Sequence, residues 1–194
     1  MRVKEWIRAS APLVPVLKGF ERAGSHGDFV RQHEWVAEVI AYASSGFSRE
    51  AFYVSMFAFP LFIPSEYLHG SYSVRRLNGE GGEVTPELVA AVEAALPELA
   101  QMATFEGLRK KAKYPATWIR HAEMHLCVGV LTEDTGLIEE TRGLLEVFTP
   151  PTVDWEEEVL ERCFAFCRLI DEGGLAAAMH ELENRRVELE PLLR

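Results

Sequence analysis

Cysteine is scarce in this 194-residue chain, which contains only three. A small and odd number of thiols does not make the disulfide framework of a small secreted domain, and it favours a reducing compartment. Cys163 and Cys167 lie four residues apart on the apolar side of a predicted helix, together with Trp155, Val159 and Phe166. Free cysteine is among the most buried residue types, so we expect reduced and packed thiols.

Long hydrophobic runs are absent as well. The most apolar stretch, AFYVSMFAFPLFI at 51–63, has thirteen residues and contains Pro60, whereas a membrane-spanning helix needs about 20. The first residues, MRVKEWIRAS, include charges where a signal peptide would have its apolar core. These features predict a cytoplasmic protein that does not contact a membrane.

The motifs of common nucleotide-binding and acyl-transfer enzymes are also missing. The chain has no P-loop, no G-x-G-x-x-G and no G-x-S-x-G nucleophile elbow. The stretch GEGG at 79–82 lacks the strand-then-helix context of a phosphate loop. We therefore expect no cofactor.

The chain has an excess of negative charge, and this excess is confined to one part of the sequence. The formal net charge is −10, and residues 132–194 account for all of it, with sixteen acidic and six basic side chains. Residues 1–84 and 85–131 are each balanced. This acidity argues against a general nucleic-acid binder and favours a basic protein partner.

The acidic excess includes the segment DWEEEVLER at 154–162. On a helix, Trp155 and Val159 are predicted to point inward, whereas Glu157, Glu158 and Glu161 form an outer face. This face is either ordinary solvated surface or a partner-binding site, and we take the three glutamates as the candidate site.

The first half of the sequence predicts a helix followed by a sheet. Pro12 and Pro15 should break the initial helix. Runs rich in Phe, Tyr and Val then predict an antiparallel meander of about four strands, with packing on both faces. These runs lie at 29–32, 35–44, 52–59 and 71–77.

The second half predicts only helices. The turn NGEGGEV at 78–84 precedes Thr85, a candidate helix cap, and Pro97 should kink or divide the helix that follows. Further helices are expected at 104–113, 116–132, 135–148, 154–171 and 174–190, the last four as two antiparallel pairs. The fold class is therefore α+β, with an α+β subdomain at 1–84 and a helical subdomain at 85–194 packed on it.

One spacing, in RHAEMHLCVG at 120–129, resembles a metal site. His121 and His125 lie four residues apart, but zinc needs a third protein ligand. The metalloprotease motif places glutamate directly after the first histidine, where this chain has Ala122. Glu123 projects to another side, in a narrow polar strip with Arg120. We expect no bound metal, and His121 and His125 remain weak candidates.

Two further clusters could carry chemistry. EYLHGSYS at 66–73 places Glu66 and His69 near two serines, but we favour a turn before a strand as the explanation of this cluster. RKKAKY at 109–114 is a basic cluster that could contact phosphate, or simply complement a helix C-terminus.

GFERAGSHGDFVR at 19–31 and FYVSMFAFPLFIPSE at 52–66 carry a resemblance to a known family. A helix ending in Gly-Phe, then Phe-x-Arg opening a strand, and later a proline-containing loop, resembles a bacterial family of uncharacterised domains (domain of unknown function 4304) over about residues 10–80. The resemblance implies an α+β domain with no established catalytic residues. Immunity proteins of bacterial toxin systems are similar in general type and size.

Three functions follow as hypotheses. The first is a non-enzymatic protein-interaction module, in one form an acidic immunity-type inhibitor of a basic toxin. The second is a hydrolase-like enzyme with a site between sheet and helices, near His69, His121 and His125. The third is a structural homo-oligomer.

Overall fold

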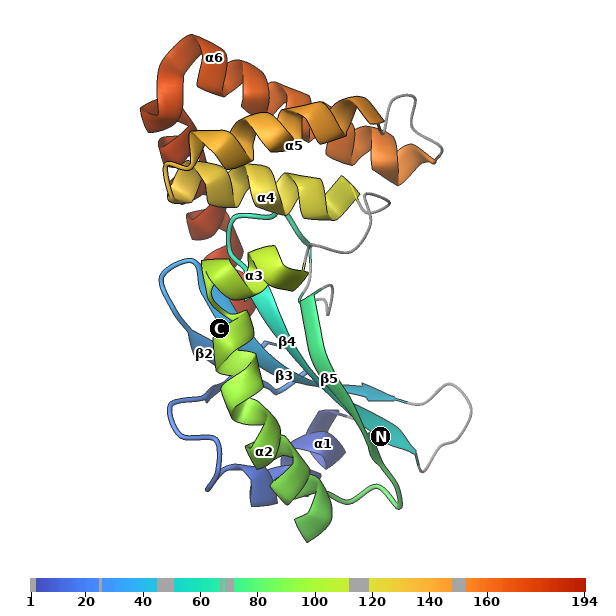
Figure 1. The fold of residues 1–194 in the computed structure, drawn as a ribbon. Helices are drawn as coiled ribbons and strands as arrows, with labels where there is room; N and C mark the ends of the chain where they lie inside the picture. The colour runs from blue at the N-terminus through green and yellow to red at the C-terminus, as the bar shows by residue number, and fades with distance from the viewer. Residues whose placement is uncertain are drawn as a thin grey trace. The chain divides into compact units, whose positions relative to one another are not determined.

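The structure, a computed structural model, describes residues 3–24, 26–44, 51–66, 68, 72–111, 119–147 and 153–194. It has an antiparallel sheet together with helices that dominate the C-terminal half, which confirms the α+β prediction (Figure 1). The chain divides into two compact units. The first comprises Met1–Leu61, Ser65–Thr104 and Leu189–Arg194, and the second comprises Phe62–Pro64 and Phe105–Glu188.

The sheet of the first unit is a five-stranded meander in the order β1-β2-β3-β4-β5. Its strands are β1 (Glu21–Ala23), β2 (Asp28–Gln32), β3 (Val36–Ser44), β4 (Phe52–Pro60) and β5 (Tyr72–Gly79). All neighbouring strands pair antiparallel. The meander is confirmed, with the short β1 in addition to the four predicted runs.

Helices cover one face of this sheet. Helix α1 (Val3–Ala9) and the 3-10 turn η1 (Ala11–Leu13) precede it, and α2 (Pro86–Met102) follows it. Trp6 of α1 is fully buried and stacks on Tyr42 of β3, with ring centroids 5.2 Å apart. The core on this face also includes apolar residues of α2 and the sheet: Leu88, Val92, Leu99, Phe29, Ile40, Phe52 and Met56.

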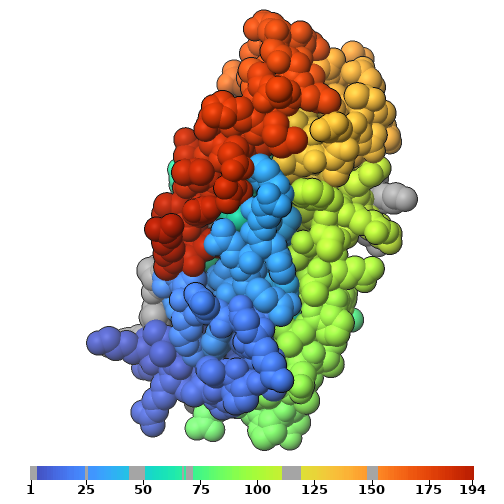
Figure 2. Space-filling model, turned by 90° about the vertical axis from the view of Figure 1, so that its left-hand side faces the viewer, coloured from blue at the N-terminus to red at the C-terminus, as the bar shows by residue number. Residues whose placement is uncertain are grey.

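The C-terminal residues cover part of the opposite face. Leu189 and Leu193, the latter in the 3-10 turn η2 (Glu190–Leu193), pack on apolar side chains such as Val39 and Phe57. The N–H of Gly24 donates to the carbonyl of Arg194 at 2.8 Å. Figure 2 shows the C-terminal end of the chain, in dark red, beside blue N-terminal segments. Both faces of the sheet are thus covered, as predicted.

Helix α2 begins where the sequence indicated. The N–H of Leu88 donates to the hydroxyl of Thr85, which is the predicted cap. Pro97 was expected either to kink this helix or to divide it. The helix continues through Pro97, so it is not divided there. Pro97 and Glu93, four residues earlier, are both exposed, so the Glu93 carbonyl that Pro97 leaves without a donor can bond to water. Because α2 packs on the sheet, the first unit extends past residue 84, the predicted boundary.

The second unit is helical. It contains α3 (Phe105–Lys111), α4 (Ile119–Leu131), α5 (Thr135–Val147) and α6 (Asp154–Leu189), which joins the first unit at its last residue. A short turn joins α4 to α5, and the carboxylate of Asp134 accepts a hydrogen bond from the N–H of Leu137. Gly129 permits close packing, because a Cβ there would lie 2.8 Å from Ile138. The pair α4–α5 matches the prediction. Helix α6 is interrupted at Gly174, whose φ of 73° and ψ of −178° are not helical, so two helices meet in a kink where the sequence predicted a break at Gly173-Gly174 (Figure 1).

Across the described residues, no helix is both long and apolar enough to cross a membrane.

Candidate protein-binding site

Helix α6 presents two different faces along its first five turns. Its inward face consists of buried apolar residues: Val159, Leu160, Cys163, Phe166 and Cys167. The outward face contains Glu157, Glu158 and Glu161, all of them exposed, as predicted. The three carboxylates lie on adjacent turns, because residues three and four apart in a helix share a side.

Trp155 was predicted to point inward, and this prediction is wrong. Its side chain is 43% exposed. The guanidinium of Arg120, on α4, lies 5.3 Å from the centroid of its ring. The tryptophan stands in the first turn of α6, where a cation–π contact with Arg120 takes the place of core packing.

An ion pair fixes α6 to α4. The Nε and Nη2 atoms of Arg162 donate to the two carboxylate oxygens of Glu123 at 2.8 and 3.1 Å. Glu123 is buried, whereas the sequence analysis placed it in a narrow polar strip of the helix. This fork-like pairing raises the pKa of Arg162 above its ordinary value.

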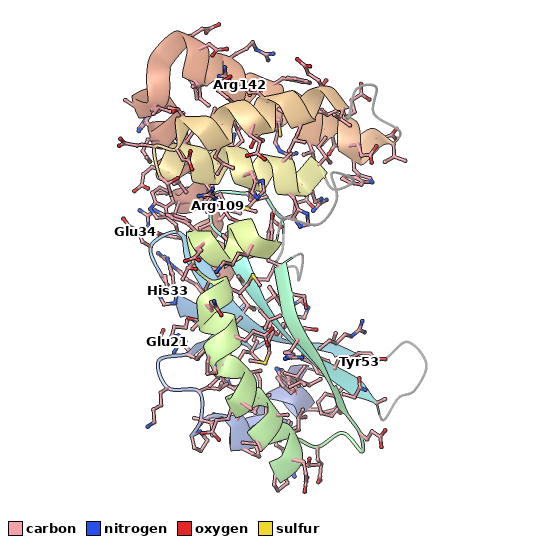
Figure 3. The ribbon with its side chains drawn as sticks, in the orientation of Figure 1. Glu21, His33, Glu34, Tyr53, Arg109 and Arg142 are labelled. Carbon is pink, nitrogen blue, oxygen red and sulfur yellow. The ribbon has the colours of Figure 1, made fainter. Side chains whose placement is uncertain are left out.

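A second link joins α6 to α5. Arg142, labelled in Figure 3, donates to the carboxylate of Asp171 at 2.7 Å and lies 3.4 Å from that of Glu139. The hydrogen bond to Asp171 raises the pKa of Arg142. The two links hold α6 at residues 162 and 171, on either side of its buried apolar face. The acidic face therefore belongs to a helix that is tied to both α4 and α5.

The cysteines are buried in the second unit, Cys127 on α4 and the other two on α6. All three thiols are free and buried, which confirms the prediction for Cys163 and Cys167. Burial raises the pKa of Cys127 to about 12 and also raises the pKa values of Cys163 and Cys167. Because the thiolate is the reactive form, these groups serve as packing residues.

Two of the three histidine candidates, His121 and His125, are among the residues that the structure describes. His121 and His125 are both partly buried in the second unit, and His69 lies outside the described residues. Burial lowers the pKa of His125, which keeps the ring neutral, while a hydrogen bond with the backbone of Arg109 acts in the opposite direction. Within the described ranges, no three His, Cys, Asp or Glu side chains are grouped to hold a metal ion.

The other predicted clusters are only partly described. Glu66 is exposed and belongs to the first unit. Arg109 and Lys110 line an open groove of about 360 Å³ in the second unit, together with Phe105, Glu106 and Thr132. Each of these cations lies near a carboxylate: Lys110 at 2.6 Å from Glu106, and Arg109 at 3.4 Å from Asp134. The local acids partly neutralise the basic cluster.

A second buried carboxylate was not foreseen from the sequence. Glu38 of β3 is fully buried, and Arg31 of β2 donates to both of its oxygens at 3.0 and 2.6 Å. The Nε2 atom of His33, labelled in Figure 3, lies 2.6 Å from the same carboxylate. This cluster connects the two strands of the β2–β3 hairpin.

Phe164 is the feature of the α6 surface that sequence reasoning missed. Its side chain is 36% exposed, and it is the only phenylalanine among the described residues to be exposed. The sequence contained a sign that Phe164 would be exposed, namely its spacing: Phe164 follows Glu157 by seven residues and Glu161 by three. Those intervals place it on the side of the helix that carries the glutamates.

Comparison with protein-family models, with curated proteins and with solved structures gave no match. The resemblance to the domain-of-unknown-function family therefore stays a prediction.

Proposed function

We propose that this protein is a non-enzymatic protein-interaction module that binds a basic protein through the exposed face of α6. The observation that carries the proposal is the exposure of Glu157, Glu158 and Glu161 together on one side of a helix whose other side is buried. The proposal extends the prediction made for these three residues from the sequence.

Charge and rigidity both support this proposal. Like charges on adjacent turns attract an oppositely charged partner and speed its approach. The pairs Arg162–Glu123 and Arg142–Asp171 hold the helix, so a partner would spend little free energy on ordering it. Inhibition of a basic toxin is one form of this function, suggested by the analogy to immunity proteins. No observation on the described residues favours the enzyme or the structural homo-oligomer.

The test uses a probe and two charge-reversed variants. The probe is a fluorescent peptide of alternating lysine and serine, and its affinity is measured at about 10 mM and about 150 mM salt, where the Debye length is about 30 and about 8 Å. The site variant carries Glu157→Lys, Glu158→Lys and Glu161→Lys. The control variant reverses three exposed glutamates of the first unit: Glu80, Glu83 and Glu93.

Both variants have a net charge of −4, because three Glu→Lys changes add six positive charges to −10. We expect the site variant to lose peptide affinity at low salt by at least about tenfold, equivalent to about 1.4 kcal/mol. The control variant should bind nearly as the wild type does, and wild-type affinity should fall as salt rises. Equal losses in the two variants would mean that net charge alone matters, and the proposed site would be wrong.

A further inference from the structure

We propose that Phe164 is the apolar anchor of the α6 surface and that the partner contacts it with a basic amphipathic helix. Such a helix has an apolar stripe flanked by lysine or arginine. This inference rests on the proposed function of α6 and specifies the chemistry of the partner.

The position of Phe164 supports the role of anchor. It lies between Glu161, three residues before it, and Arg168, four residues after it, and both are exposed. Ala165, beside it, is also exposed. Phenylalanine is among the residues most often buried, and aromatic side chains surrounded by polar contacts are typical energetic centres of protein interfaces.

The shape of the surface favours a helix as the contacting element. Residues 157, 161, 164 and 168 follow one another at intervals of four, three and four, and so form a ridge along α6. Ridges of this kind pack into the grooves between side chains of a second helix, with the axes about 8–10 Å apart. An apolar groove would receive Phe164, and flanking cations would face Glu157 and Glu161.

Charge complementarity selects a basic helix over a second copy of this chain. Two copies of α6 packed in parallel would bring Glu157, Glu158 and Glu161 of one copy near the same residues of the other, and in any orientation two chains of net charge −10 repel each other. Like charges in an interface are strongly unfavourable. A helix that carries lysines beside its apolar stripe matches both the charge and the apolar centre.

The experiment compares two peptides of about 20 residues, long enough for a marginally stable helix. The first is an amphipathic helix of lysine and leucine. The second has the same lysines, with glutamine in place of each leucine. Each is titrated by calorimetry into the full chain, into Phe164→Ala, into Phe164→Leu and into Val187→Ala. Val187 is another exposed apolar residue of α6, so its truncation is the matched control.

We expect the wild type to bind the amphipathic peptide at least about tenfold more tightly than the polar peptide, as an anchor residue requires. Phe164→Ala should abolish that difference while leaving the affinity for the polar peptide unchanged. Phe164→Leu should keep most of the difference in affinity between the two peptides, and Val187→Ala should keep all of that difference. Circular dichroism and the melting temperature establish that each variant is folded.

The outcomes separate the anchor from the acidic site. If Phe164→Ala binds the amphipathic peptide as tightly as the wild type does, Phe164 is not the anchor, although the proposed function can still hold. If the Glu157, Glu158 and Glu161 reversal leaves the polar peptide's affinity unchanged, the proposed function itself fails. If neither peptide binds to the wild type, both proposals are contradicted.

Discussion

Removing one partner of the Glu123–Arg162 pair should destabilise the second unit by an amount that depends on which partner is removed. The two side chains are not equally buried: Glu123 is 3% exposed and Arg162 is 34% exposed. In Arg162→Met, a carboxylate stays inside the protein without its cation. In Glu123→Gln, the guanidinium stays partly hydrated and the amide oxygen can still accept a hydrogen bond.

The magnitudes follow from this asymmetry. Two unit charges about 4 Å apart attract by about 4 kcal/mol at an effective dielectric constant of about 20. Leaving a buried charge without its partner typically costs about 3–5 kcal/mol, which is our expectation for Arg162→Met. For Glu123→Gln we expect a smaller loss, about 1–2 kcal/mol. The double change Glu123→Leu with Arg162→Met removes both charges and should lie closer to the wild type than Arg162→Met alone.

Urea unfolding followed by circular dichroism at 222 nm measures these differences. The Lys110→Ala variant is a suitable control, because its pair with Glu106 is exposed on both sides and should contribute less than about 1 kcal/mol. If Arg162→Met costs less than Glu123→Gln, or no more than Lys110→Ala, the pair does not hold α6 in the way described.

Three further predictions concern other parts of the chain. The raised pKa values of Cys127, Cys163 and Cys167 predict slow reaction of the native protein with a thiol reagent at about pH 8, and rapid reaction after unfolding in urea; rapid native reaction would contradict their burial. Burial raises the pKa of Asp28, so its contribution to stability is present at low pH and is lost as pH rises through the folded-state value. Asp28→Asn keeps an oxygen that can accept a hydrogen bond from the N–H of Tyr42. This variant should become more stable relative to the wild type as pH rises from about 4 to about 7. A stability difference in urea unfolding that does not change with pH would refute this. Gly129→Ala should cost about 1–3 kcal/mol in the same assay, because the new methyl group would lie 2.8 Å from Ile138, whereas Gly143→Ala meets no atom within 4 Å and should be tolerated.

Local signals in the sequence predicted most of the fold. Thr85 was identified as a helix cap from its side chain and the proline after it, and the structure shows the hydrogen bond to Leu88. Strand β1 was not predicted, because Glu-Arg-Ala has no strand-like pattern, and its pairing with β2 depends on the turn that follows. Trp155 was misplaced because a helical wheel reports only the periodicity within one helix and does not show which side chains of other helices cover a given position.

The residues of the candidate site could be predicted only in part. The three glutamates were identified from local charge and helical spacing. The burial of Glu123 could not be foreseen, because its partner Arg162 lies 39 residues away in the sequence. Pairing at that distance depends on how α4 and α6 pack, and a single sequence carries no local sign of it.

The most direct test of the central claim is to locate the binding surface by NMR. Amide chemical shifts of the ¹⁵N-labelled chain would be followed during titration with the lysine–serine peptide at low salt. Binding through the acidic face predicts that the largest changes fall on Asp154–Glu172 of α6 and vanish in the variant with Glu157, Glu158 and Glu161 reversed. Changes centred on the sheet of the first unit, or the same changes in that variant, would contradict the claim.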